Sequence, residues 1–348
     1  MADRLLDMRY GRWLQGLGVA AGLALAVGLF AHTGVTPVLD AMRKINWWQF
    51  GLICLSYPLV LAADSAGWSF SFPRGTAPYG RLLLARAAGE AVNAASVLGP
   101  VGGEPLRAWL VRPWVPYEES VPSLIVAKTA NVAAQAAFVA VALGLAIAIE
   151  LDRRLVLGLG LLLAIQIVAL LGFVAGQLKG GMSWLGRLIE RFGVRGGQRS
   201  ATHMDRMLGS YYRDNRGRFA AALGFHLLGR LLGAVEVWVI LWALGHTVPT
   251  ITALALEAIG SGVRFVLFFL PGGLGVLEGA NTAAFGALGL GASLGLAFSL
   301  LRRARQVVWI LLGLAAIGAA RLGVSRRAAA APPPTGSRES RRPRRAAR

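Results

Sequence analysis

The chain has 348 residues, of which 55% are hydrophobic and 15% are charged, whereas soluble globular proteins carry about 25% charged residues. Several apolar runs exceed the roughly 18 residues that identify a membrane-spanning helix, so the composition excludes a soluble domain and indicates an all-α, polytopic membrane bundle. The net charge of +19 gathers in the loop at residues 178–218 and in the C-terminal tail, where cytoplasmic segments carry it. No nucleic-acid-binding module accompanies this charge, so we expect contact with anionic lipid headgroups and none with nucleic acid.

Two apolar runs open the chain. The first, from Leu14 to Ala31, follows three arginines and lacks the small-residue cleavage pattern of a signal peptide, so we predict an uncleaved span with a cytoplasmic start. A basic loop follows, and Trp47 and Trp48 are typical of an interfacial anchor. The second span, at residues 50–70, contains Asp64, which is either a site residue or a helix-end carboxylate near the interface.

The stretch at residues 86–112 is apolar yet carries several ionisable side chains. A charge at the bilayer centre costs roughly 2.5 to 3.5 kcal/mol, so such residues usually face a cavity or a partner. Its middle, Gly99 to Gly103, contains a proline and three glycines and cannot continue a helix. We predict two half-helices joined by a glycine-rich tip that dip into the membrane and line a polar cavity. The alternative is an ordinary loop with its charges at the water interface.

The next span, residues 121–149, places Lys128, Asn131 and Gln135 on one helical face through their spacing of three and four. They are candidates for the same cavity. For Asn131 and Gln135, interhelical hydrogen bonds that only hold the bundle together are the alternative.

A clean apolar span at residues 155–176 leads into the basic loop. An apolar stripe in this loop predicts a short amphipathic helix at residues 182–193 that lies in the headgroup region; a partner-binding helix is the alternative. Another span, residues 219–244, carries His226, Arg230 and Glu236, of which the last two are six residues apart and do not share a face.

The stretch at residues 257–285 repeats the first arrangement, with Pro271 and several glycines at the break and Glu278 just beyond. Glu278 is followed 24 residues later by Arg302, as Glu104 is by Lys128. Paired, interrupted apolar segments are the sequence pointer to a transporter-type site. Because the second stretch enters from the external side and the first from the cytoplasmic side, we expect two broken, re-entrant helix pairs related as inverted repeats.

The last apolar region, residues 291–322, is interrupted by Arg302, Arg303 and Arg305. At a cavity these arginines could clamp a phosphate or carboxylate; the alternative is two shorter spans with the arginines in a connecting loop. Residues 326–348 are rich in alanine, proline, serine and arginine, and we expect a disordered cytoplasmic tail after a membrane domain at residues 1–325.

Catalytic chemistry finds little support in the sequence. The four histidines have no metal-ligand spacing, no phosphate loop or nucleophile elbow occurs, and we predict no metal and no cofactor. Glu90, Glu104 and Glu278 could form an acid/base pair, but they are also suitable salt-bridge partners for Arg107, Lys128 and Arg302.

The runs GEAVNAASVLGPVGGEPLR, LPGGLGVLEG and LLRRARQ resemble the flippase-like transmembrane family, also called the lysylphosphatidylglycerol synthase transmembrane domain family. The resemblance extends over most of residues 10–322, and the first run resembles most the hopanoid-biosynthesis-associated subgroup. It implies an all-helical protein of the bacterial inner membrane that moves lipids or lipid-linked molecules between leaflets. One departure is Lys128, where relatives often carry an acidic residue. The substrate of those relatives therefore cannot be assigned directly to this chain. Lysyl transfer is not expected, because the aminoacyl-transferring members need a soluble catalytic domain and this chain ends in a tail.

The candidate substrate-binding residues are Arg86, Glu90, Asn93, Glu104, Arg107, Lys128, Asn131, Glu278, Arg302, Arg303 and Arg305. The candidate hinge residues are Pro100, Gly102, Gly103, Pro271, Gly272, Gly273 and Gly275.

Three functions are open to these residues. The first is a translocase for a lipid with an anionic or phosphorylated headgroup, with both termini in the cytoplasm. The second is a membrane-embedded lipid-modifying enzyme. The third is a non-transporting scaffold for lipid-biosynthesis enzymes.

Overall fold

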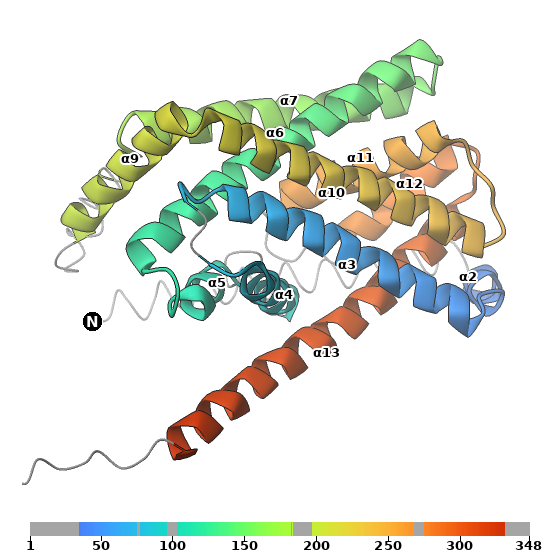
Figure 1. Cartoon of the computed structure of the whole chain (residues 1–348). Coiled ribbons are helices and arrows are strands. Elements are labelled where there is room, and N and C mark those ends of the chain that lie inside the picture. The colour runs from blue at the N-terminus through green and yellow to red at the C-terminus, as the bar shows by residue number, and fades with distance from the viewer. Residues whose placement is uncertain are drawn as a thin grey trace, which may run out of the picture.

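A computed structural model describes residues 35–74, 77–95, 103–181, 183, 197–267 and 275–330. Every regular element in these ranges is an α-helix (Figure 1), as the sequence predicts. The helices are α2 (Val35–Arg43), α3 (Trp47–Phe70), α4 (Tyr79–Ala95), α5 (Gly103–Val111), α6 (Tyr117–Ala148), α7 (Arg153–Leu178), α9 (Gly197–Asp214), α10 (Arg216–Ala243), α11 (Thr250–Leu267), α12 (Val276–Ala287) and α13 (Ala292–Ala330).

Five helices among the described residues, α3, α6, α7, α10 and α11, are long and apolar enough to cross a membrane. The first four confirm the spans predicted from the apolar runs. Trp47, with 87% of its surface exposed, and Trp48 begin α3, the position expected of an interfacial anchor. The span predicted at residues 14–31 lies outside the described residues.

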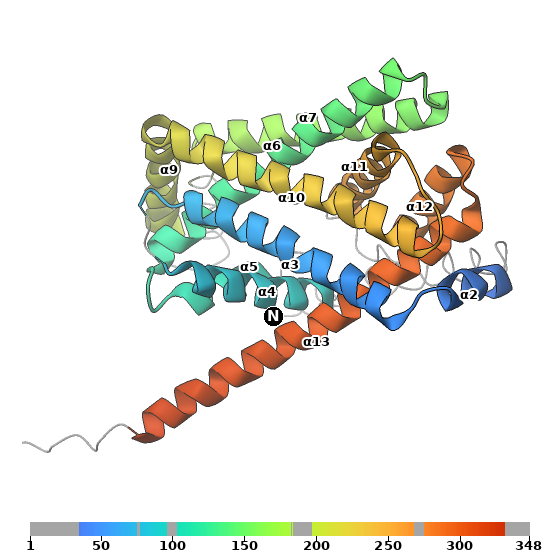
Figure 2. The ribbon, with the colours of Figure 1, turned by 45° about the vertical axis from the view of Figure 1, so that its right-hand side comes forward.

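The long helices are stacked in layers (Figure 2). α7 packs on α6, α6 on α10, α10 on α3 and α3 on α4. α11 packs against α6, α7 and α10. α12 packs against both α11 and α13, and α13 also packs against α4.

Each predicted broken stretch contains two separate helices in contact, α4 with α5 and α11 with α12. At 1.5 Å per residue, the nine residues of α5 reach about 14 Å and the twelve residues of α12 about 18 Å. Neither length crosses the roughly 30 Å of a hydrocarbon core. The tips themselves, residues 96–102 and 268–274, lie outside the described residues.

The structure corrects two expectations about the connecting segments. The loop predicted after the first span contains the short helix α2, which packs on α13. The basic loop contains α9, which packs on α6, α7 and α10, whereas the predicted amphipathic helix at residues 182–193 lies outside the described residues apart from Ser183. α9 was missed because its polar sequence has no long apolar run; it buries only a narrow stripe that includes Leu208 and Tyr211.

The arginines of the last apolar region lie inside α13, so the two-span alternative with a connecting loop is wrong. α13 continues to Ala330, five residues beyond the predicted end of the membrane domain. Residues 331–348 of the predicted tail lie outside the described residues.

An apolar core joins α10, α12 and α13. Phe285 of α12 and Phe298 of α13 place their ring centroids 5.2 Å apart, and both pack in one cluster with Ile240 of α10. Gln135 of α6 donates a hydrogen bond of 2.8 Å to the carbonyl of Ser261 on α11. Gln135 therefore has the structural role that the sequence left open for it.

Candidate functional site: a charge-lined cavity

A cavity of about 440 Å³ lies between α3, α4, α10, α11, α12 and α13. Ten charged side chains line it, which is a large number for the interior of a membrane bundle, where such residues usually mark a pathway or a binding site. They are Asp64, Glu90, Arg230, Glu236, Glu257, Arg264, Glu278, Arg302, Arg303 and Arg305.

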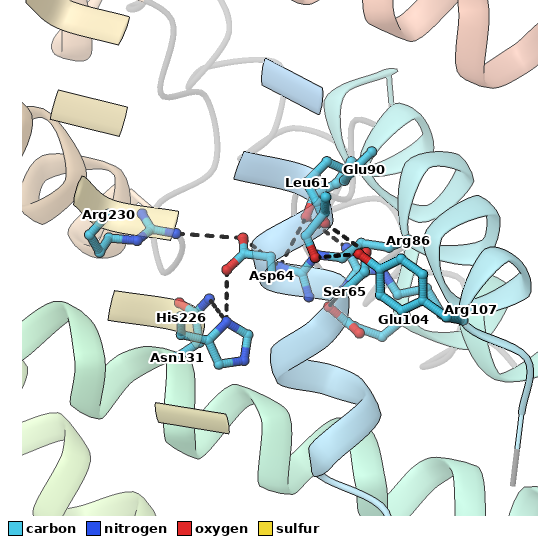
Figure 3. A network of polar contacts seen from close by, with 12 residues as sticks. Leu61, Asp64, Ser65, Arg86, Glu90, Glu104, Arg107, Asn131, His226 and Arg230 are labelled. Carbon is cyan, nitrogen blue, oxygen red and sulfur yellow. Dashed lines mark hydrogen bonds and ion pairs between the residues drawn. The ribbon is translucent and has the colours of Figure 1, made fainter. Parts of the chain in front are cut away.

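Asp64 of α3 is the centre of a first network of charges (Figure 3). Its carboxylate lies 3.0 Å from Nη2 of Arg86 on α4 and 3.8 Å from Nη2 of Arg230 on α10. His226, also on α10, places Nδ1 2.7 Å from the other carboxylate oxygen. Asp64 is therefore not the helix-end carboxylate that the sequence offered as an alternative, because it is buried and joins three helices.

The first network continues into the α4–α5 pair. Arg107 of α5 donates hydrogen bonds of 2.8 Å to Glu90 of α4 and to Glu104 of its own helix. Arg86 also lies 3.9 Å from Glu90. These contacts join three carboxylates and three guanidinium groups, and α3, α4, α5 and α10 are held by the same charges.

The α4–α5 pair is close-packed where Arg107 crosses it. A Cβ atom at Gly103 would overlap the carbonyl oxygen of Gly89, and a Cβ at Gly89 would overlap the Arg107 side chain. The backbone N–H of Gly103 donates a hydrogen bond of 2.6 Å to the side chain of Asn93, which satisfies one of the free donors at the start of α5. Asn93 thus caps the start of α5, and Gly103 is the position at which α5 crosses α4 most closely.

A second network surrounds Glu257 of α11. Glu257 accepts hydrogen bonds of 2.7 Å from Arg264 on its own helix and 2.6 Å from Arg302 of α13. Arg302 also places Nε 3.3 Å from Glu236 of α10, and Arg305 donates to the other oxygen of Glu236. Arg303 donates a hydrogen bond of 2.6 Å to Glu278 of α12.

The second network contains one more cation than anion. Its three carboxylates, Glu236, Glu257 and Glu278, face four guanidinium groups, those of Arg264, Arg302, Arg303 and Arg305. In a medium of low dielectric constant this excess positive charge attracts an anion more strongly than it would in water. The side of the cavity formed by α11 and α13 is therefore the one suited to a phosphate or carboxylate group.

Two of the four arginines are accessible. The side chains of Arg264 and Arg303 retain 37% and 36% of their exposed surface, whereas Arg302 and Arg305 retain 11% and 12%. Arg302 is held between the buried carboxylates of Glu236 and Glu257, and Arg305 is held by Glu236. The accessible guanidinium groups of Arg264 and Arg303 are consequently the ones that a ligand in the cavity can reach.

α10 allows both networks to approach it because it carries two glycines one turn apart. A Cβ atom at Gly229 would lie 3.1 Å from Asp64, and a Cβ at Gly233 would lie 3.1 Å from Glu257. Small residues at this spacing let neighbouring helices approach closely in membranes. Here they make space for one carboxylate from α3 and one from α11.

Most of the predicted site residues belong to these two networks. They are Arg86, Glu90, Glu104, Arg107, Glu278, Arg302, Arg303 and Arg305. Arg302 pairs with Glu236 and Glu257, whereas Glu278 pairs with Arg303. Glu104 pairs with Arg107.

Two of the predicted site residues, Lys128 and Asn131, lie on α6, next to the first network. Lys128 is exposed, and its electrostatic neighbours include Glu104 and Glu90. The amide nitrogen of Asn131 lies 3.2 Å from Nδ1 of His226. Neither residue lines the cavity; Asn131 lies beside the histidine.

Only two of the predicted hinge residues, Gly103 and Gly275, are among the described residues. Gly275 has a φ of 84°, in the left-handed region that favours glycine, and its N–H donates to Glu278 at 2.8 Å. This contact fixes the start of α12 beside the cavity. Pro100, Gly102, Pro271, Gly272 and Gly273 lie outside the described residues.

Sequence reasoning left Asp64 open and missed five further residues of the networks as site residues: His226, Arg230, Glu236, Glu257 and Arg264. The available signal was a charged or imidazole side chain in an apolar helix, which all of them provide. What the sequence could not supply was the partner of each, since every ion pair that these residues form, except Glu257–Arg264, joins two helices. Among the described residues no group of three or more histidine, cysteine or acidic side chains could hold a metal ion.

Comparison with known proteins gives one match. Residues 13–314 match the family described as the lysylphosphatidylglycerol synthase TM region. No curated protein and no solved structure is significantly similar to the chain. The match covers most of the chain and includes both helix pairs and all the residues of the two charge networks, so the chain belongs to the lysylphosphatidylglycerol synthase transmembrane region family.

Proposed function

We propose that this protein binds a lipid with an anionic or phosphorylated headgroup in the charge-lined cavity and moves it between the two leaflets of a bacterial inner membrane. The observation that carries the proposal is the excess positive charge of the second network, with Arg264 and Arg303 accessible from the cavity. The headgroup would bind there, and the acyl chains would leave between helices toward the lipid.

The apolar part of the cavity wall supports a lipid ligand. Leu267, Leu277, Trp309 and Ile310 line the cavity together with the charged groups. A polar headgroup with apolar chains needs both kinds of surface, because chains left in water would cost about 0.8 kcal/mol per CH₂ group. A soluble anion would need only the arginines.

The proposal includes the arrangement of the two helix pairs. α4–α5 and α11–α12 would be re-entrant pairs from opposite sides of the membrane, related as inverted repeats, with the chain termini in the cytoplasm. The short lengths of α5 and α12 support this arrangement, which is a common basis for alternating access. The resemblance of the first broken stretch to the hopanoid-biosynthesis-associated subgroup motivates the finer proposal that the cargo belongs to hopanoid-linked lipid metabolism.

Mass spectrometry of the lipids that co-purify with the protein tests the binding step. We expect one lipid class with a phosphorylated or otherwise anionic headgroup to be enriched over the bulk membrane in the wild type and in Arg153→Gln. This control removes an exposed arginine at the start of α7, away from the cavity. The enrichment should disappear in Arg264→Gln, Arg303→Gln. A lipid profile equal to the bulk membrane in all three proteins would contradict the proposed site.

A transport assay then separates translocation from binding. Fluorescent derivatives of the enriched lipid, placed in proteoliposomes, should become accessible to an external reductant at a rate that depends on the protein and falls in the double variant. Enrichment without any protein-dependent movement would favour the scaffold function, in which the protein presents a bound lipid to biosynthetic enzymes. A changed lipid product in place of movement would favour an enzyme.

A further inference from the structure

His226 is the most deeply buried ionisable group of the first network. It is fully buried on α10, and its Nδ1 atom lies 2.7 Å from Asp64. Because an ionised carboxylate only accepts hydrogen bonds, Nδ1 must carry a proton and donate it to Asp64. The second ring nitrogen, Nε2, is buried and has no hydrogen-bond partner among the described residues.

This arrangement leaves Nε2 of a neutral imidazole with a free lone pair. A Cβ atom at Gly67 of α3 would lie 2.8 Å from Nε2, so the glycine leaves just enough space for the ring. No described donor occupies the lone pair, and a proton can therefore bind there without displacing another group. Asp64, which lines the cavity, stands between His226 and the cavity.

The charges around the pair decide when that proton binds. Arg86 from α4 and Arg230 from α10 both face Asp64, while α6 contributes the neutral Asn131 to the histidine. The three carboxylates and three guanidinium groups of the first network balance each other, so the network is neutral while the imidazole is neutral. The exposed Lys128, beside Glu104 and Glu90, adds positive charge nearby. A proton on His226 would therefore add an uncompensated positive charge.

A negative ligand in the cavity changes this balance. Arg230 lines the cavity and makes the longest of the contacts to Asp64, at 3.8 Å. An anionic headgroup would attract Arg230 away from Asp64 and would itself supply a negative charge. Both effects favour the imidazolium form of His226, and by thermodynamic linkage a proton on His226 must strengthen binding of the anion by the same factor.

We infer that Asp64 and His226 form a proton-binding site in the wall of the cavity, and that the protein binds one proton together with one anionic headgroup. The proton adds to Nε2 of His226 and no other bond changes. Paired binding of a proton and an anion leaves the buried charge unchanged, which lowers the cost of carrying both through the membrane interior. The proton gradient then supplies a driving force for lipid movement; this last step rests on the proposed function, but the proton site itself does not.

Nuclear magnetic resonance of protein labelled at its histidines tests the proton site directly. The chain has four histidines, and His226→Gln assigns the resonance of interest. We expect this resonance to titrate, with about tenfold higher proton affinity in dioctanoyl phosphatidylglycerol than in dioctanoyl phosphatidylcholine. The resonance of His246, which is exposed in the α10–α11 connection, serves as the internal control and should shift far less. A His226 resonance that does not titrate, or that titrates identically in both lipids, would overturn the inference.

Arg230→Gln provides a second measurement in case His226→Gln does not fold. Removal of this cation should increase the proton affinity of His226 in the zwitterionic lipid and reduce the difference between the two lipids. An unchanged titration would contradict the assigned role of Arg230.

Proteoliposomes with an imposed pH gradient complete the test. Movement of fluorescent phosphatidylglycerol should respond to the gradient in the wild type and lose that response in His226→Gln. If no protein moves the lipid at any pH while the lipid-dependent titration of His226 is observed, the proposed function fails and the proton site stands. Movement that ignores the gradient in the wild type overturns the coupling.

Discussion

Gly233 of α10 lies directly against the carboxylate of Glu257 on α11, so that a Cβ atom at this position would be 3.1 Å from the Glu257 Cδ atom. Glu257 cannot retreat easily, because Arg264 and Arg302 hold its two oxygens. The position of the Glu257 carboxylate in the second network therefore depends on the absence of a side chain at Gly233.

Gly233→Ala should therefore destabilise the protein by about 1 to 3 kcal/mol, the usual range for overpacking a filled interior, and should weaken lipid binding. Thermal unfolding in detergent and lipid co-purification measure the two effects. Gly224→Ala is the matched control, since Gly224 lies on the same helix with nothing within 4 Å of its added Cβ. Equal behaviour of the two variants would mean that the Glu257 position is not constrained by α10.

Glu257 and Arg302 should behave as one unit. Loss of either partner leaves a buried charge with one counterion instead of two, so Glu257→Gln and Arg302→Gln should each destabilise the protein, by less than the roughly 3 to 5 kcal/mol of a buried charge that loses its sole partner. The double variant should cost clearly less than the sum of the two single changes, because no charge of this pair is then left alone. A double-mutant cycle of unfolding free energies measures the coupling, and strictly additive values would show that the pair does not interact.

Gly103→Ala should disrupt the α4–α5 pair. The added Cβ would overlap the carbonyl oxygen of Gly89, and a backbone atom cannot move aside as a flexible side chain can. We expect a loss of about 3 kcal/mol, the upper end of the overpacking range, together with weaker contact of Arg107 to Glu90. Gly80→Ala, on α4 with open space around it, should leave the melting temperature unchanged. A stable Gly103→Ala variant would contradict the close crossing of α4 and α5.

The attachment of α9 should weaken at high pH. Burial raises the pKa of Tyr211 to about 12, with Arg218 opposing the shift, and the Tyr211 hydroxyl donates a hydrogen bond of 2.8 Å to the carbonyl of Phe70. Because the folded protein prefers the neutral phenol, this contribution to stability is complete below pH 10 and is lost as the pH rises toward 12.

The free energy of unfolding of the wild type should thus fall more steeply above about pH 10 than that of Tyr211→Phe, which has no phenol to ionise at this position. Parallel pH profiles of the two proteins would place Tyr211 outside the packed part of α9.

Much of the helix pattern could be predicted from the sequence. Apolar runs long enough to cross a membrane predicted α3, α6, α7 and α10, and the Gly-Pro breaks separated α4 from α5 and α11 from α12. These signals are local, since an apolar run or a proline acts within its own segment. α9 has no comparable local signal and was missed.

The pairing of charges could not be predicted in the same way. Arg230 and Glu236 lie six residues apart on α10, and each pairs with another helix, Arg230 with Asp64 and Glu236 with Arg302 and Arg305. Which side of a helix faces a partner depends on its rotation and tilt. In a membrane the apolar pattern says little about rotation, because lipid and protein neighbours are equally apolar.

The paired charges also constrain how this chain can diverge. A change at Glu236 or Glu278 alone takes the counterion from Arg305 or Arg303 of α13, and a change at Glu257 alone takes it from Arg264 of α11. The first substitution at such a pair is therefore the harmful one, and the second restores the balance. Related chains should therefore retain or lose the two members of each pair together. A set of homologues in which Arg303 changes independently of Glu278, but Arg302 does not change independently of Glu257, would separate the groups that bind cargo from those that only hold α10, α11 and α13 together.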